Sequence, residues 1–117
     1  MQDKPCVFCN IANSNDNSSV VLRDDLIIVI RDLYPRAPTH LLIIPCKHIG
    51  TLSVKTDEVS KILGHMFAMA GQIAISEEVD QSGYRLVVNQ GLDAGQEIEH
   101  LHMHLLGGTH LGPVCEA

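Results

Sequence analysis

Three of the seven histidines in this 117-residue chain, His100, His102 and His104, lie at a spacing of two. The residues between them, Leu101 and Met103, are apolar, and strict alternation of this kind is typical of a half-buried β-strand. Because successive side chains of a strand point to opposite faces, the three imidazoles are expected to share one face, about 6–7 Å apart. Imidazole titrates near neutral pH, so such a face suits nucleophilic and acid/base chemistry or metal binding.

The residues alone leave three interpretations of this histidine-rich segment open. It can be a solvated strand face that happens to carry histidines, although the Gly107-Gly108 exit argues against this. Two histidines at i and i+2 can bind one metal ion, but a third on a straight strand would be too distant, since zinc–nitrogen bonds are about 2.0–2.1 Å long. In the third interpretation one ring attacks an electrophile while its neighbours position and neutralise an anion.

A second chemical motif is the C-x-x-C pair formed by Cys6 and Cys9. The start of the chain, residues 1–6, is polar and has no apolar signal segment, so we expect a cytoplasmic protein. Disulfides are rare in that compartment. In a cytosolic chain the C-x-x-C spacing is typical of a metal knuckle or a redox pair.

Composition bounds the class of protein. The length predicts one domain spanning residues 1–117, and the 45% apolar content is typical of a globular chain. No apolar run approaches the roughly 20 residues that a membrane-spanning helix needs, so no membrane association is expected. The net charge of −6 argues against a nucleic-acid partner. A small anionic ligand remains compatible, because local hydrogen-bond donors can outweigh the global charge.

The first half of the chain predicts a short helix followed by three strands. A helical turn is expected within residues 5–12, with Pro5 at its first position. The polar stretch 13–19 has the composition of a surface loop. Two β-branched runs, 20–22 and 26–30, predict a hairpin, and the apolar run 40–45 predicts a central strand.

The second half predicts one long helix and two further strands. Thr56 is placed to cap a helix that begins at Asp57 and continues with helical apolar spacing to about Glu78. His65 of this helix is expected at the surface. Residues 84–89 predict a fourth strand, and a glycine-bearing loop leads from it into the histidine strand. The fold class is therefore α+β, with an antiparallel sheet of about five strands, one long helix and a short N-terminal helix.

The segment His100-Leu101-His102-Met103-His104-Leu105-Leu106 resembles the signature of the histidine-triad (HIT) family, and most closely its nucleotide-binding branch. The resemblance covers nearly the whole chain, with supporting stretches at 32–33, 37–40, 44–45, 47–48, 63–65, 83–85, 87–89 and 106–108. It implies a HIT-like α+β fold in a homodimer whose two sheets join into one. It also implies hydrolysis of nucleoside 5′-phosphoramidates, such as adenosine 5′-phosphoramidate, or of related nucleotidyl bonds, through a nucleotidyl-histidine intermediate.

The resemblance implies a catalytic role for three histidines. His102, the middle histidine of the motif, would attack the α-phosphorus through one ring nitrogen while the other ring nitrogen keeps its proton. His104 and His40 would flank the phosphate, stabilise its charge and protonate the leaving amine. No metal is required for this step.

The resemblance also implies a set of substrate-binding residues. Asp32 would accept hydrogen bonds from the ribose hydroxyls, with a turn role as the alternative, and Asn89 would lie beside the phosphate. The backbone amides after Gly95, at Gln96 and Glu97, are candidates for an oxyanion cradle. Glu97 stands where close relatives often have Ser or Thr, and a carboxylate near an anion is unfavourable. The purine pocket would be lined by apolar residues that could equally be plain core: Val7, Phe8, Ile11 and Leu33.

Some members of the family bind a structural zinc through a C-x-x-C near the start of the chain. The resemblance implies the ligand set Cys6, Cys9, His48 and His100 here, and Cys2His2 is a closed tetrahedral set. The alternative is a pair of reduced thiols packed beneath the sheet. Two other function classes also remain open: a purine-nucleotide-binding or partner-interaction module with little catalysis, built on the zinc site, and a metalloenzyme that uses all three motif histidines.

Overall fold

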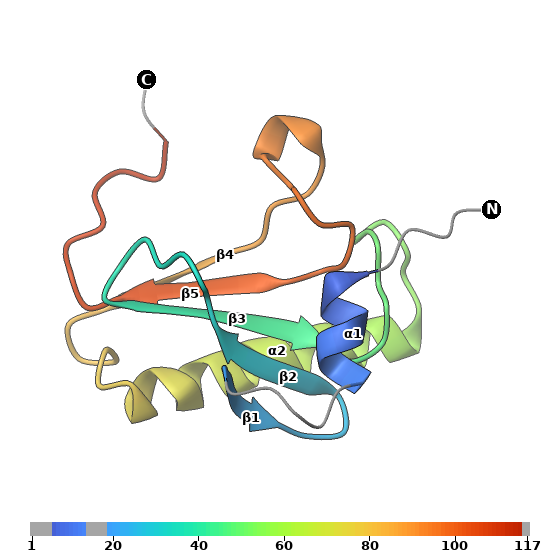
Figure 1. Cartoon of the computed structure of the whole chain (residues 1–117), viewed down its shortest axis with the longest axis horizontal. Helices are drawn as coiled ribbons and strands as arrows, with labels where there is room; N and C mark the ends of the chain where they lie inside the picture. The colour runs from blue at the N-terminus through green and yellow to red at the C-terminus, as the bar shows by residue number, and fades with distance from the viewer. Residues whose placement is uncertain (1–5, 14–18, 116–117) are drawn as a thin grey trace.

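A five-stranded antiparallel sheet with one helix on each face forms the frame of the molecule (Figure 1). The structure is a computed structural model that describes residues 6–13 and 19–115. The strands follow the spatial order β1-β2-β3-β5-β4, which makes β3 central and leaves β1 and β4 at the edges. Their bounds are Val20–Arg23 (β1), Ile27–Arg31 (β2), Thr39–Pro45 (β3), Tyr84–Val87 (β4) and Met103–Gly107 (β5). The helices are α1 (Val7–Asn13), α2 (Asp57–Ser76) and a 3-10 turn, η1 (Leu92–Ala94).

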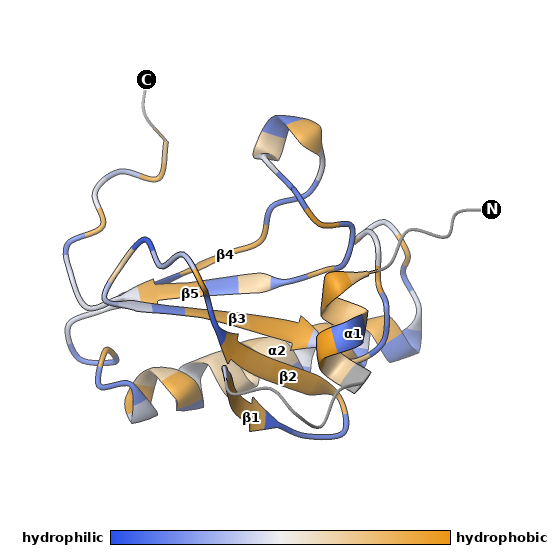
Figure 2. Cartoon of the chain, viewed as in Figure 1, coloured by the Kyte–Doolittle hydropathy of each residue, from blue (hydrophilic) through white to orange (hydrophobic). Residues whose placement is uncertain are grey.

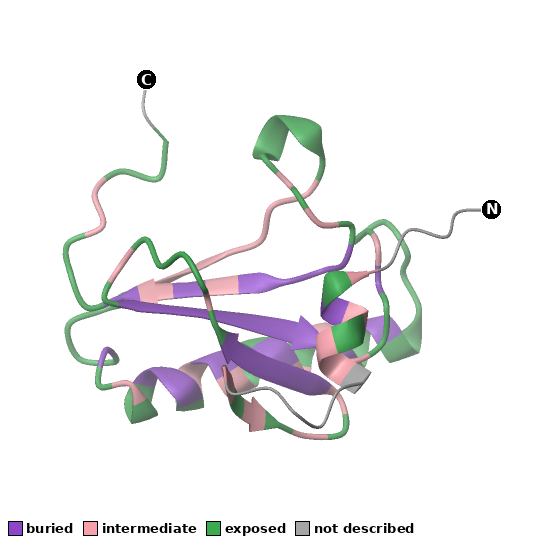
Figure 3. Ribbon diagram, viewed as in Figure 1, coloured by how far each residue is buried: buried purple, intermediate pink, exposed green. Residues whose placement is uncertain are grey.

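The two faces of the sheet carry separate apolar clusters. Alternate residues of β2 and β3, among them Val29 and Ile43, pack under α2. The residues between them, such as Ile28 and Ile44, pack under α1 through Phe8. Because both faces are covered, β3 is buried along its whole length and carries an almost continuous apolar run (Figures 2 and 3). Polar side chains on the sheet face that α1 covers are therefore shielded from solvent.

Most predicted elements are confirmed. The hairpin of β1 and β2 and the central position of β3 are as the sequence indicated. The helix α2 begins at Asp57, and Thr56 Oγ1 accepts the Val59 N–H at 3.1 Å, as expected of an N-cap. It ends at Ser76, two residues before the predicted end.

The histidine strand is shorter than its pattern predicts, because β5 begins only at Met103. Its neighbour β3 ends at Pro45, and the Pro45 carbonyl accepts a bond from the His100 ring at 2.9 Å in place of a ladder bond. The Leu101 N–H bonds instead to the Ile49 carbonyl at 2.6 Å. Only His104 of the three motif histidines thus lies in a regular strand.

Several smaller expectations also change or lie outside the described residues. The strand β4 ends at Val87, two residues short of Asn89, and Asn13 belongs to α1 and not to the following loop. Pro5 and residues 14–18 lie outside the described residues. His65, which was expected at the surface, is partly buried. Its Nε2 lies 2.7 Å from Asp24 Oδ2, and this contact connects α2 to the β1–β2 hairpin. Within the described ranges, no helix has the length and apolar character to cross a membrane.

Candidate active site

A cavity of about 180 Å³ opens on the sheet face that α1 covers, and three histidines line it. Its walls come from α1, the loop between β2 and β3, the segment that follows β4, and the start of β5. The lining residues are Phe8, Asp32, Tyr34, Arg36, His40, Leu42, Asn89, Gly95, Glu97, Ile98, His102 and His104. The cavity therefore combines an apolar wall with a row of imidazoles, as a site for a small polar ligand requires.

His102 is buried and held in one tautomer by the backbone. Its Nδ1 lies 2.8 Å from the carbonyl oxygen of His100. A carbonyl oxygen only accepts hydrogen bonds, so Nδ1 carries the proton and Nε2 keeps its lone pair. The ring of Phe8 packs edge-on against the imidazole with centroids 5.0 Å apart, which restricts its rotation. In this tautomer His102 is oriented as a nitrogen nucleophile.

His40 and His104 form a hydrogen-bonded pair whose proton positions also follow from the backbone. The Arg36 N–H donates to His40 Nδ1 at 3.1 Å, so the proton of the neutral ring lies on Nε2. That Nε2–H donates to His104 Nδ1 at 2.9 Å. His104 must then carry its own proton on Nε2. The cavity therefore offers one nitrogen lone pair, on His102, and one N–H donor, on His104.

The two flanking histidines are neutral in the free protein. Burial, with the charges of His102 and His40, lowers the pKa of His104 to about 4. Burial also lowers the pKa of His40, although the nearby Asp32 carboxylate partly offsets this effect. Asp32 Oδ2 lies 3.4 Å from His40 Nε2 and is a second acceptor for its proton. A positive charge on either ring consequently requires a nearby anion at neutral pH.

The free energy of unfolding is expected to decrease as the pH decreases, because the folded protein resists protonation of His104. The unfolded chain binds a proton at this residue below a pKa of about 6.5, whereas the folded chain binds it only below about 4. The contribution of His104 is fully present above pH about 6.5 and is lost progressively as pH falls toward about 4. Over this pH range the free energy of unfolding should decrease by about 1–3 kcal/mol less in His104→Gln than in the wild type.

Urea unfolding at about pH 7 and about pH 4.5 measures the effect. The exposed His110 of the C-terminal segment supplies the matched control, since His110→Gln removes an imidazole outside the cavity. Identical pH dependence in the wild type and in His104→Gln would contradict the neutral assignment of this ring.

The loop that follows β4 closes the cavity and is braced internally. The Asn89 side chain donates to the Ala94 carbonyl at 2.8 Å, and Gly95 has a left-handed φ of 79° that favours glycine. The Gln96 N–H donates to the Gly91 carbonyl at 3.1 Å. The Gln96 N–H is thus bonded within the loop, and its predicted place in an oxyanion cradle stays a prediction. Glu97 lies in the cavity wall.

The cavity contains eight of the twelve residues predicted for catalysis and substrate binding: His40, His102, His104, Asp32, Asn89, Gly95, Glu97 and Phe8. Val7 and Leu33 are 54% and 79% exposed and lie outside its lining, and Ile11 packs against the core beneath α1. Gln96 braces its own loop through Gly91 and Ile98. Their roles in ligand binding stay predictions.

Sequence reasoning missed four lining residues, Tyr34, Arg36, Leu42 and Ile98. Leu42 was detectable in principle, since it lies two residues after His40 on the same strand and therefore on the same face. Tyr34 and Arg36 lie in the sequence between Asp32 and His40, two predicted site residues. This position could have indicated that they line the cavity. Ile98 lies in an irregular segment whose course no periodicity predicts.

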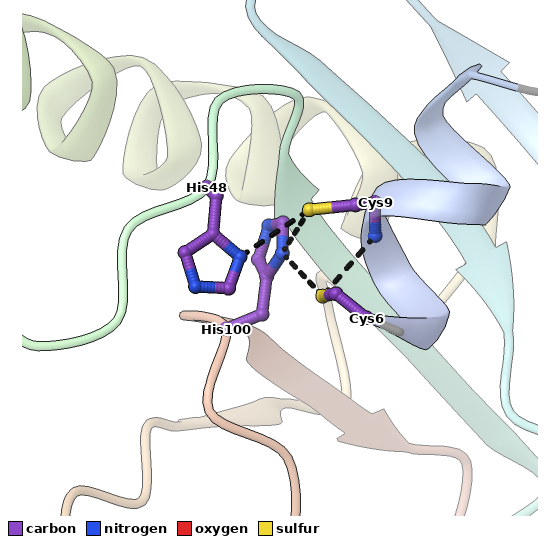
Figure 4. Close-up of side chains that lie close together, drawn as sticks. All are labelled: Cys6, Cys9, His48 and His100. Carbon is purple, nitrogen blue, oxygen red and sulfur yellow. Dashed lines mark hydrogen bonds between the residues drawn. The ribbon is translucent and has the colours of Figure 1, made fainter. Parts of the chain in front are cut away.

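A second cluster brings together the two cysteines and two further histidines (Figure 4). Cys6 Sγ lies 3.3 Å from His100 Nδ1, and Cys9 Sγ lies 3.3 Å from His48 Nδ1 and 3.5 Å from His100 Nδ1. All four ligand atoms lie within 4.8 Å of one another. Figure 4 shows that Cys9 comes from α1, that Cys6 lies at the start of this helix, and that both rings turn their Nδ1 toward the sulfurs. The predicted Cys2His2 set is thus assembled in space.

The chemistry of this donor set fits a divalent metal. His100 Nε2 donates to the Pro45 carbonyl, which fixes the tautomer and leaves Nδ1 free to coordinate. The Cys9 N–H points at Cys6 Sγ at 3.3 Å, an orientation that stabilises a thiolate. Burial, with the hydrogen bond and charge of Cys6, raises the pKa of Cys9 to about 11, so its proton is displaced at neutral pH only by a strong cation.

The three motif histidines do not converge on one ion. His100 turns to the cysteines, while His102 and His104 face the cavity, and Nδ1 of each of these two rings is already hydrogen-bonded. Asp32, His40 and His104 are close enough to hold a metal. However, the bond of 2.9 Å between the two rings places a hydrogen between their nitrogens. The geometry therefore favours separate metal and reaction sites over a triad-bound metal.

Comparisons with known proteins find similarity over most of the chain. The family model described as "HIT domain" matches residues 13–111. The purine nucleoside phosphoramidase of Escherichia coli (strain K12) is 44% identical over 108 residues, which cover 92% of this chain and 91% of that protein. A HIT family hydrolase from Legionella pneumophila Philadelphia 1 is 44% identical with a TM-score of 0.87, covering 92% of this chain and 96% of that one. A histidine triad protein from Clostridium difficile is 39% identical with a TM-score of 0.87, covering 97% and 98%.

Proposed function

Because this chain belongs to the HIT domain family, we propose that it is a nucleotide-binding hydrolase that cleaves nucleoside 5′-phosphoramidates through a nucleotidyl bond to His102. The observation that carries the proposal is the tautomer of His102. Its Nδ1–H is held by the His100 carbonyl, so the Nε2 lone pair is available on a ring that lines the cavity. The Escherichia coli relative, named as a purine nucleoside phosphoramidase, supports a purine nucleotide as the substrate.

In the first step His102 Nε2 forms a bond to the α-phosphorus, and the phosphorus–nitrogen bond of the substrate breaks with its electron pair going to the amine. The amine needs a proton, because an amide ion is too basic to leave. A bound phosphate anion favours the charged form of His104, which can then protonate the departing nitrogen. When His104 carries the extra proton on Nδ1, the His40 Nε2–H retains Asp32 Oδ2 as an acceptor.

In the second step water attacks phosphorus and the bond to His102 breaks. The electron pair returns to Nε2 of His102, the proton of the water passes to His104 Nε2, and His104 Nδ1 releases its extra proton to solvent, which restores the starting state. The backbone amide of Glu97 is the donor proposed to stabilise the phosphoryl oxygens in both steps, and the His104 Nε2–H contributes until its proton passes to the amine. We assign the nucleoside to the apolar wall of Phe8 and Ile98, with Asp32 near the ribose and Asn89 near the phosphate.

We propose that the Cys/His cluster holds a structural zinc ion, with Cys6, Cys9, His48 and His100 as ligands. The ion would supply a cross-link between α1, the segment after β3 and the segment before β5, and catalysis would not depend on metal chemistry. Since α1 has only seven residues, it is too short to be stable alone. Fixing α1 in turn fixes Phe8, which contacts His102.

We also propose that the protein is a cytoplasmic homodimer whose sheets join edge to edge. The strand β4 lies at the edge of the sheet, where its unpaired side is able to accept another strand. Large apolar side chains are exposed on β4 and the neighbouring helix α2: Tyr84, Phe67 and Ile75 are 38%, 58% and 55% exposed. Covering these residues in a dimer would bury apolar surface.

Incubation with adenosine 5′-phosphoramidate tests the proposed reaction. The expected products are AMP and ammonia, and rapid quenching in alkali should preserve a nucleotidyl adduct that intact-mass spectrometry detects. A protein that binds AMP in calorimetry but releases none from this substrate would support the alternative, a nucleotide-binding module with little catalysis. Chelation of the metal before the assay separates a structural from a catalytic ion, since turnover by the folded chelated protein is expected to continue.

A further inference from the structure

The cavity holds one permanent cation that the proposed reaction does not use. Among its described lining residues, Arg36 is the one lysine or arginine, whereas Asp32 and Glu97 supply two carboxylates. The protein as a whole carries a net charge of −6. A guanidinium in the wall of a cavity that is otherwise acidic or neutral is therefore the residue best suited to attract an anion there.

The guanidinium of Arg36 has no ion pair or hydrogen bond with another described residue, unlike the other arginines of the fold. Arg31 forms a two-bond ion pair with Glu77 at 2.9 and 3.0 Å. Arg85 donates to the Gly112 carbonyl at 2.6 Å, and Arg23 donates to the Ala12 carbonyl. Arginine in folded proteins commonly binds carboxylate or phosphate through its planar fork, and in Arg36 that fork is free for a ligand.

The backbone around Arg36 is fastened to the reaction site. The Tyr34 N–H donates to Asp32 Oδ1 at 2.8 Å, and the Arg36 N–H donates to His40 Nδ1. Pro35 stiffens the connection between them. Tyr34 and Arg36 thus belong to a short loop whose position is fixed by hydrogen bonds to Asp32 and His40, two residues of the cavity. Tyr34 also lines the cavity and is 82% exposed, so its side chain lies at the rim and not in the core.

The size of the cavity indicates which part of a substrate reaches this rim. At about 180 Å³ it is smaller than the roughly 300–1,000 Å³ typical of small-molecule sites, so part of a nucleotide conjugate must extend beyond it. The α-phosphorus must lie against His102, which is only 8% exposed and forms the floor. The exposed Arg36 therefore meets a group farther out. The sugar and base of a nucleoside 5′-phosphoramidate are uncharged, so any further anion belongs to the leaving group.

We propose that Arg36, together with Tyr34 of the same loop, forms an anion-binding subsite that takes a carboxylate or phosphate carried by the leaving group of the substrate. This inference rests on the proposed hydrolysis of nucleoside 5′-phosphoramidates. The Glu97 carboxylate in another part of the wall repels an anion and thereby favours its placement at Arg36. The chain should then select conjugates whose leaving amine bears a negative charge over equally sized neutral ones.

A matched set of substrates tests the subsite. Adenosine 5′-phosphoramidates of glycine and glycinamide differ only in a carboxylate against a neutral amide, and the conjugate of phosphoethanolamine supplies a phosphate. We expect the wild type to favour the glycine conjugate over the glycinamide conjugate by about tenfold in kcat/KM. In Arg36→Gln the ratio should fall to about one, while Arg36→Lys should keep part of it. The glycine and phosphoethanolamine arms show whether carboxylate or phosphate is preferred.

A control variant separates the subsite from overall charge. Lys61→Gln removes one positive charge from an exposed position of α2, outside the cavity, and is expected to leave the ratio unchanged. Equal losses on both conjugates in Arg36→Gln would assign Arg36 to the α-phosphate and overturn the inference, as would a wild type without preference. Absence of turnover of all the conjugates would instead overturn the proposed function, and this inference with it.

Discussion

Replacing His102 with alanine is expected to abolish measurable release of AMP from adenosine 5′-phosphoramidate, with a fall in kcat of at least about 10³-fold. The imidazole supplies the atom that bonds to phosphorus, and no other described ring in the cavity offers a free lone pair. In the neutral pair, Nδ1 of His104 accepts a bond from His40, and Nδ1 of His40 accepts the Arg36 N–H. Loss of one lone pair should therefore remove the covalent step, because no neighbour is placed to replace it.

The affinity for AMP separates this loss from a general collapse of the site. The nucleoside is assigned to Phe8, Ile98 and Asp32, so His102→Ala should bind AMP within a few-fold of the wild type in calorimetry. His110→Ala, which removes an exposed imidazole from the C-terminal segment, should retain both the binding of AMP and its release from the substrate. Turnover by His102→Ala at a rate near that of the wild type would refute the nucleotidyl-histidine route. The alkaline-stable adduct should vanish in the same variant.

The core elements were predictable because one physical signal dominates each of them. β3 is covered on both faces, and its apolar run indicates this directly. In α2 the Thr56 cap and the helical spacing of its apolar residues agree, which is why its start was placed correctly. Of the cavity histidines, His102 and His104 alternate with apolar residues, and this pattern indicated a shared face. His40 begins a continuous apolar run, so only the family resemblance implied its place in the site, on a strand where Leu42 pairs with His104.

The regions that sequence reasoning missed are those where single hydrogen bonds set the course of the chain. The start of β5 depends on the His100 ring bonding to the Pro45 carbonyl, a contact between residues far apart in the sequence. The Gln96 N–H bonds to the Gly91 carbonyl within a glycine-bearing loop whose turn type the residues alone leave open. Arg36 enters the site because its own backbone N–H bonds to His40. Periodicity carries no information on such contacts.

Removal of one cysteine from the Cys/His cluster is expected to release the metal and to destabilise the fold strongly. A zinc ion present at about 1,000 times its dissociation constant stabilises the folded state by about 4 kcal/mol. For a chain of this length, at about 3–5 °C for each kcal/mol, that loss lowers the melting temperature by at least about 10 °C. Cys9→Ser should show this decrease, because Cys9 lies within 3.5 Å of both histidine ligands.

Metal analysis and thermal unfolding measure the two parts of this prediction. Cys115 provides the matched control: it is a free, exposed cysteine outside the cluster, and Cys115→Ser should keep both the metal and the melting temperature. Treatment of the wild type with a chelator should reproduce the Cys9→Ser decrease, and addition of zinc should reverse it. A Cys9→Ser protein with full zinc content would show that the cluster is not the binding site.

His102→Ala links the two predictions, because the two sites share a segment but not their ligands. His100 turns toward the cysteines while His102, two residues later, faces the cavity, and the His100 carbonyl fixes the His102 ring. His102→Ala is therefore expected to retain one zinc ion per chain although its turnover is lost. In Cys9→Ser, by contrast, loss of zinc should come first. This loss releases α1, and it affects the nucleophile His102 only through the contact with Phe8. Loss of zinc from His102→Ala would place the ion on the reacting ring and would require a metal-centred reaction instead.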